Sequence, residues 1–271
     1  MAAVIVRPVE DHAMPRFSAN LSFLYAEHGF IERFAAARAD GFAAVELHFP
    51  YAHDLSELAE TLRREAQEMV LFNLPAGDWE AGERGIACHP KRVQEFQDGI
   101  ALAIDFARAL GCPRLNCLAG LSPSGVSEAR MRETLIENLR FAAFTLKHAG
   151  IELLIEPINT RDLPGFFVHS TRQALDIMDA VGNDNLRLQY DIYHAQVMEG
   201  DLAHTLENNL ARIGHIQLAD NPGRHEPGTG EINFPFLLRH LDRLGYSGWI
   251  GCEYRPLTAT TAGLKWLREF Q

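Results

Sequence analysis

Short apolar runs alternate with longer amphipathic segments along nearly the whole chain. From Arg16 onward, each apolar run is followed by a loop or a stretch of helical period. The runs predict eight strands, at residues 17–21, 43–47, 70–74, 115–118, 152–156, 186–191, 214–218 and 249–253. The segments between and after them predict eight helices, at about residues 27–39, 54–68, 90–110, 126–150, 170–181, 201–212, 234–244 and 260–270.

The order of these elements favours one fold class. Strands separated by single helices imply parallel strands joined by right-handed crossovers. Eight such pairs in about 255 residues predict an α/β protein with a single (β/α)₈ TIM barrel. A doubly wound sheet is the competing architecture, but it usually carries a glycine-rich turn after its first strand. Here the first strand is followed by Ser22-Phe23-Leu24-Tyr25, which contains no glycine.

The first residues of the chain differ in pattern from the rest. Residues 1–13 do not fit the strand and helix pattern, and Met14 comes just before the first predicted strand. We therefore expect residues 1–15 to be a disordered leader and residues 16–271 to form one catalytic domain. The segment 75–89, after the third predicted strand, is a long loop, and long loops in compact domains are often functional.

Charge and apolar content exclude two classes of partner. The 271 residues include 36 acidic and 25 basic side chains, for a formal charge of −11. Nucleic-acid binders take most of their affinity from basic side chains, so no nucleic-acid partner is expected. No run approaches the roughly 18 apolar residues of a membrane helix, so we expect no membrane partner and a cytoplasmic location.

Polar side chains end four successive predicted strands. Glu156, Asp191, Gln217 and Glu253 are separated by 35, 26 and 36 residues, each about one strand and helix repeat. A single strand-end acid is more often a helix cap or an ion-pair partner than a functional group. Four of them would converge at the barrel mouth where TIM-barrel chemistry takes place. Three carboxylates and an amide are oxygen ligands, which suit Mg²⁺ or Mn²⁺ better than Zn²⁺.

Three more side chains are expected near the same mouth. Glu46 ends the second predicted strand, His194 follows Asp191 by three positions, and Arg224 lies in the loop of residues 220–231. We interpret all three as substrate-binding, since an imidazole or a guanidinium donates to substrate oxygens. The alternatives are that His194 caps a helix and that Arg224 is solvated.

Four stretches resemble a known family. Residues 155–159 (IEPIN), 190–194 (YDIYH), 215–220 (HIQLAD) and 228–233 (GTGEIN) are similar to the xylose-isomerase-like TIM barrels, and most to their hydroxypyruvate isomerase and 2-oxo-tetronate isomerase branch. The resemblance covers about residues 16–268.

The resemblance implies roles for the four strand-end residues. It makes Glu156, Asp191, Gln217 and Glu253 metal ligands, with the two glutamates as the acid/base pair. Relatives that act on longer ketoses carry histidine at the Gln217 position, so this glutamine favours the hydroxypyruvate branch.

The implied reaction is a metal-assisted isomerisation of the aldose–ketose type. A proton moves between C2 and C3 through an enediolate, which interconverts hydroxypyruvate and tartronate semialdehyde or acts on the homologous 2-oxo-tetronate. The implied partners are a small 2-oxo acid or sugar acid and further copies of the chain in a homo-oligomer.

Two other functions use the same fold. A ketose 3-epimerase would need the same ion and glutamates with a pocket open to a longer chain. A barrel that binds a sugar acid without catalysis belongs to another functional class, and the presence of both glutamates argues against it. The apurinic endonuclease branch binds several zinc ions through many histidines and has a basic surface, which the charge of −11 disfavours.

Overall fold

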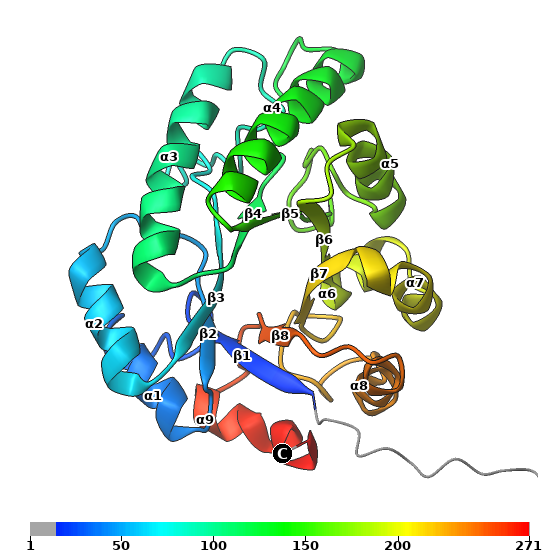
Figure 1. Cartoon of the computed structure of the whole chain (residues 1–271). Helices are drawn as coiled ribbons and strands as arrows, with labels where there is room; N and C mark the ends of the chain where they lie inside the picture. The colour runs from blue at the N-terminus through cyan, green and yellow to red at the C-terminus, as the bar shows by residue number, and fades with distance from the viewer. Residues whose placement is uncertain (1–14, 271) are drawn as a thin grey trace, which may run out of the picture.

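A computed structural model describes residues 15–270, and they form a closed barrel (Figure 1). The eight strands are parallel and neighbour one another in chain order. The first pairs with the last, from Arg16 opposite Trp249 to Ala19 opposite Cys252, which closes the sheet. The predicted single (β/α)₈ TIM barrel is therefore confirmed. The predicted leader lies outside the described residues, apart from Pro15.

The strands are short and lie close to their predicted positions. They are β1 (Arg16–Asn20), β2 (Ala44–Glu46), β3 (Glu68–Asn73), β4 (Arg114–Cys117), β5 (Glu152–Ile155), β6 (Leu186–Asp191), β7 (Ile213–Leu218) and β8 (Trp249–Cys252). Glu156 and Glu253 are the first residues beyond β5 and β8, so both leave the barrel at its carboxyl end.

Helices surround the barrel as an outer layer (Figure 1). They are α1 (Glu32–Ala39), α2 (Leu55–Glu65), α3 (Val93–Leu110), α4 (Glu128–His148), α5 (Thr171–Val181), α6 (Ile192–Met198), α7 (Leu202–Asn209), α8 (Phe234–Arg243) and α9 (Thr260–Gly263), which a 3₁₀ helix (Leu264–Phe270) follows. None of the helices in residues 15–270 is both long and apolar enough to cross a membrane.

The helical period of the sequence predicts the long helices but not the short helix α6. This helix has seven residues and begins directly after β6, with no loop between them. The Asp191 side chain caps it by accepting the main-chain N–H of Tyr193 at 2.8 Å. About two helical turns leave too few positions for a helical period to be recognised in the sequence. The longer α2 is capped in the same way, since Asp54 accepts the main-chain N–H of Glu57 at 2.9 Å.

Polar side chains fill part of the barrel interior. Glu46 on β2 and His215 on β7 are fully buried, and Glu46 Oε2 lies 2.8 Å from His215 Nε2. Because β2 and β7 are not neighbours in the sheet, this contact crosses the inside of the barrel. The main apolar core consists of side chains from strands and helices, such as Leu115, Leu153 and Leu139. The cavity at the carboxyl ends of the strands therefore lies above hydrogen-bonded polar groups and not above an apolar core.

Candidate active site

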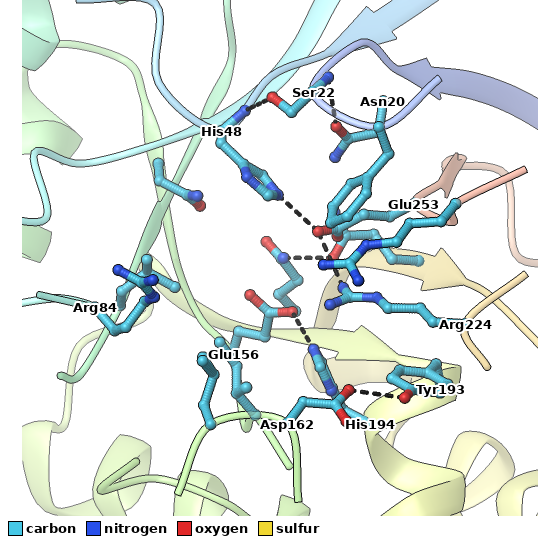
Figure 2. A pocket seen from close by; sticks show the side chains of 18 of the residues that line it. Asn20, Ser22, His48, Arg84, Glu156, Asp162, Tyr193, His194, Arg224 and Glu253 are labelled. Carbon is cyan, nitrogen blue, oxygen red and sulfur yellow. Dashed lines mark hydrogen bonds and ion pairs between the residues drawn. The ribbon is translucent and has the colours of Figure 1, made fainter. Parts of the chain in front are cut away.

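A cavity of about 780 Å³ opens among the carboxyl ends of the strands (Figure 2). Its wall includes Asn20 and Asn73, the last residues of β1 and β3, together with Gln217 of β7. Glu156 and Glu253 enter it from the ends of β5 and β8. The position at the carboxyl end of the barrel is the one where TIM-barrel enzymes carry their active sites.

Three of the predicted residues form a compact buried group. One ligand atom from each of Glu156, Asp191 and His194 lies within 4.8 Å of the other two. His194 Nε2 is 3.5 Å from Asp191 Oδ2 and 3.9 Å from Glu156 Oε1. Glu156 also accepts a hydrogen bond of 2.9 Å from the Asn116 amide, which directs its carboxylate toward the cavity.

Arg224 joins Glu253 to this group. Its Nη2 lies 3.1 Å from Glu253 Oε1 and 3.4 Å from Asp191 Oδ2. The same Glu253 oxygen is 2.8 Å from His48 Nε2. The structure thus brings together five of the predicted site residues: Glu156, Asp191, His194, Arg224 and Glu253. All of these except Asp191 are labelled in Figure 2.

Burial and nearby charges shift the pKa values of the three carboxyl groups in different directions. It raises the pKa of Glu156 well above its usual range, and the negative charges of Glu253 and Asp191 raise it further. Burial also raises the pKa of Asp191, to about 7, although Arg224 opposes the shift. Burial would raise the pKa of Glu253 as well, but Arg224 and His48 outweigh it, so this pKa is lowered. Glu253 is therefore the carboxyl group best kept ionised.

A divalent cation fits this donor set. Three buried carboxyl groups converge here, and Arg224 is the single arginine within 4 Å of them in the described residues. Such an excess of buried negative charge is costly unless a cation offsets it. Carboxylate oxygens are ligands that Mg²⁺ and Mn²⁺ prefer.

His194 is oriented from behind by Asn159. The main-chain N–H of Asn159 donates to Nδ1 of the ring at 3.4 Å, and the side-chain amide lies 2.7 Å from the same atom. Burial, with a smaller contribution from Arg224, lowers the His194 pKa well below its usual value, so the ring is neutral. A neutral ring that accepts at Nδ1 carries its proton on Nε2. Nε2–H then faces the cavity as a hydrogen-bond donor.

Gln217 and Glu46 form a linked pair. The amide nitrogen of Gln217 donates to Glu46 Oε1 at 2.7 Å, and its amide oxygen accepts from Gln189 at 2.6 Å. Glu46 is fully buried below the cavity, where it also accepts from Ser18 and Asn20. Its carboxylate thus reaches Gln217 from beneath and does not line the cavity. This contact determines the orientation of the Gln217 amide, because the amide nitrogen must point toward the carboxylate oxygen that accepts from it.

Several residues of the site were not selected from the sequence. Asn116 holds Glu156, and Tyr193 donates to Asp162 at 2.7 Å on the cavity wall. The sequence does contain a signal for Asn116, which is a polar residue within the apolar run of residues 115–118. The structure buries its amide fully. A buried amide needs a partner, so a polar residue inside such a run points to a hydrogen-bonded site.

Comparison with known proteins gives consistent results. A family model described as "Xylose isomerase-like TIM barrel" matches residues 34–270. The chain is 54% identical to hydroxypyruvate isomerase of Escherichia coli over 95% of this chain and 100% of that protein. It is 50% identical to 2-oxo-tetronate isomerase of Cupriavidus necator over 95% of this chain and 99% of that one. A crystal structure titled AP endonuclease, family 2, from Brucella melitensis has 43% identity and a TM-score of 0.93, and covers 95% of this chain and 100% of that chain.

Proposed function

The chain belongs to the family of xylose isomerase-like TIM barrels, and we propose that it is an isomerase of hydroxypyruvate or of the homologous 2-oxo-tetronate. The observation that carries the proposal is the pair of buried glutamates, Glu156 and Glu253, that enter one cavity from β5 and β8. Similarity to two isomerases over almost their full lengths supports the same activity.

The two glutamates are proposed to move one proton between neighbouring carbons. Glu253, which Arg224 and His48 keep ionised, removes the proton from C3 of hydroxypyruvate while the C2=C3 double bond forms. Glu156, whose burial favours its protonated form, returns a proton to C2. The hydroxyl proton passes from the C3 oxygen to the C2 oxygen, which leaves tartronate semialdehyde.

A resident cation is proposed to be held by Glu156, Asp191 and Glu253, with the amide oxygen of Gln217 as a fourth donor. When bound, Mg²⁺ or Mn²⁺ would supply positive charge next to the substrate oxygens that become negative. Glu46 positions Gln217 by accepting a hydrogen bond from its amide nitrogen, so the amide oxygen, which accepts from Gln189, is the end left to coordinate a cation.

Two further side chains are proposed to orient the substrate. His194 presents Nε2–H to the cavity, and Arg224 presents a guanidinium that remains charged at all working pH values. Both donate hydrogen bonds and neither accepts one at these atoms, so they suit carbonyl and hydroxyl oxygens. Their contacts with Asp191 hold them at fixed positions before substrate binds.

Replacing each glutamate tests the acid/base assignment. Glu156→Gln and Glu253→Gln keep the shape of the site but cannot transfer the proton, so we expect the turnover of hydroxypyruvate to fall by about 10²–10⁴-fold. NMR of hydroxypyruvate with the enzyme and Mg²⁺ in heavy water measures conversion and deuterium uptake together. Glu133→Gln, on the exposed side of α4, is the matched control. Full activity in both active-site variants would refute the assignment.

A substrate panel separates the neighbouring functions. Hydroxypyruvate, 2-oxo-tetronate, pentuloses and hexuloses differ in length, and conversion restricted to the longer ketoses would identify a 3-epimerase instead. Binding of a 2-oxo acid with no deuterium uptake would identify a non-catalytic barrel. Sedimentation of the purified protein measures the homo-oligomer that the family resemblance predicts.

A further inference from the structure

The proposed substrates carry a negative charge that the cluster of Glu156, Asp191 and Glu253, the acidic group, does not attract. Hydroxypyruvate and 2-oxo-tetronate both carry a carboxylate at C1, next to the carbonyl at C2. Glu253, which Arg224 and His48 keep ionised, repels this carboxylate, and the cost of bringing like charges together in a buried site is high. A 2-oxo acid therefore needs a cationic side chain elsewhere on the cavity wall, a requirement that rests on the proposed function.

Four arginines line the cavity, and two of them already face acids. These four are Arg84, Arg161, Arg224 and Arg255. Arg224 lies against Asp191 and Glu253, and Arg161 lies 3.6 Å from Asp162 and donates to Tyr193. Within residues 15–270, Arg84 and Arg255 are the cavity arginines with no carboxylate partner.

Arg84 is held in place without being neutralised. Its Nη1 donates to the main-chain carbonyls of Trp79 at 2.9 Å and Glu83 at 2.7 Å. Its guanidinium lies over the Trp79 ring, 4.1 Å from the centroid, and the residue is half-buried. Its Nε and Nη2 have no hydrogen-bond partner in the described part of the chain. Two free donors on one planar group match the two oxygens of a carboxylate.

The acid next to Arg84 in the chain is turned away from it. Glu83 forms an ion pair with Arg92 and accepts the main-chain N–H of Asp78 at 2.5 Å. Gly85, on the other side, sits so close to β4's end that an added Cβ would lie 2.4 Å from the Leu118 carbonyl oxygen. The loop is therefore fastened on both sides of Arg84, which directs this side chain inward.

Figure 2 shows Arg84 and Arg224 on opposite sides of the cavity, with Glu156 between them in this view. We propose that Arg84 binds the C1 carboxylate of the substrate and thereby selects 2-oxo acids over uncharged ketoses. Arg255 is exposed, where water screens an ion pair, so it is the weaker candidate for this contact. The reacting carbons would then lie between Arg84 and the acidic group.

Kinetics of Arg84→Gln test the proposal. The carboxylate keeps its charge through the reaction, so Arg84 stabilises the bound substrate and the transition state equally. We expect the KM for hydroxypyruvate to rise by about 10- to 100-fold with kcat changed by less than about 3-fold. Arg84→Lys, which keeps the charge but loses the planar fork, is expected to recover part of the loss.

Three controls distinguish carboxylate recognition from a structural role. Arg255→Gln tests whether the other unpaired cavity arginine makes this contact instead: a rise in KM for hydroxypyruvate as large as that of Arg84→Gln would overturn the proposal. Arg130→Gln, at an exposed arginine of α4 outside the cavity, also removes one positive charge and should leave KM unchanged. Dihydroxyacetone has the ketone and hydroxyls without the carboxylate, so its inhibition constant should be the same for the wild type and Arg84→Gln. An unchanged KM in Arg84→Gln, or an equal loss for dihydroxyacetone, would overturn the proposal. A wild-type enzyme that converts neither 2-oxo acid would instead refute the proposed function.

Discussion

Asp191 uses its two oxygen atoms for different tasks. Oδ1 accepts the main-chain N–H of Tyr193 and so caps α6. Oδ2 lies 3.4 Å from Arg224 Nη2 and 3.5 Å from His194 Nε2, two residues of the cavity wall. Because the cap fixes the orientation of the side chain, the second oxygen is held beside these two groups. One residue thus connects the end of a strand, the start of a helix and the site.

The pKa of Asp191 predicts how cation binding depends on pH. Burial raises this pKa to about 7, so the folded protein binds a proton that the unfolded chain releases near pH 4. The stabilising contribution of this proton is complete at low pH and is lost as the pH rises toward 7. A cation instead requires the ionised carboxylate. We therefore expect Mg²⁺ or Mn²⁺ to raise the melting temperature more at about pH 8 than at about pH 5.

Thermal melts of the wild type with added cation or with EDTA measure this difference. Asp191→Asn provides the comparison, because the amide neither titrates nor offers a charged oxygen, and its cation-dependent shift should be small at both pH values. Equal shifts at the two pH values in the wild type would contradict the expectation.

The loop after β3 depends on close approach between two backbones. Gly85 has φ of +111°, and an added Cβ would lie 2.4 Å from the Leu118 carbonyl oxygen. Gly120 meets the same contact from the other side, since its Cβ would lie 2.4 Å from the Gly85 carbonyl oxygen. Only glycine allows both the positive φ and the close contact. This contact fastens the segment that carries Arg84.

Substitution of two glycines in this loop separates conformational strain from steric contact. Gly85→Ala should lower the free energy of unfolding by about 3 kcal/mol and raise the KM for hydroxypyruvate, because Arg84 is displaced. Gly82→Ala is the matched control, since Gly82 has φ of +95° but no atom lies within 4 Å of its added Cβ. It should lower the free energy of unfolding by only about 1 kcal/mol and leave KM unchanged. Denaturant titration and steady-state kinetics measure both quantities, and equal effects of the two variants would argue against the contact.

At the scale of the whole molecule, the barrel closes where the two ends of the described chain meet. β1 pairs with β8, and Phe17 on β1 packs edge-on against Trp266 at 5.3 Å between ring centroids. Phe17 also meets Phe270 at 6.5 Å in the last 3₁₀ helix. The C-terminal segment therefore covers the closing pair of strands with aromatic side chains.

Removal of one ring at this closure should weaken the whole barrel. The Phe17 side chain is only 7% exposed, so Phe17→Ala should lower the free energy of unfolding by about 3–5 kcal/mol. Because the ring lies outside the cavity wall, kcat of the folded fraction should not change. Phe144→Ala is the control, since Phe144 is 62% exposed and its loss should cost less than about 1 kcal/mol. Similar unfolding midpoints for the two variants would show that Phe17 does not support the closure.

The pattern of residues along the chain was enough to predict the barrel and the acids at the strand ends. Eight alternations of apolar run and helical segment allow few architectures, because parallel strands need crossovers and crossovers have one hand. Once the barrel is inferred, the ends of consecutive strands must meet at one mouth, and Glu156, Asp191 and Glu253 do meet there. Local pattern sufficed because strand position alone places these residues.

The pairs of side chains that bond across the barrel could not be predicted before the chain was seen folded. Strand position placed Glu46 and Gln217 near the mouth, but they are 171 positions apart and no local pattern shows that they bond to each other. Arg84 lies in a loop with no periodic pattern, so the sequence does not show that its side chain lines the cavity. Their placement depends on the rotation of each strand, the path of the loop and the side chains that compete for each hydrogen bond. These are through-space properties of the packed chain, and the charge states of Glu156 and Glu253 depend on them in the same way.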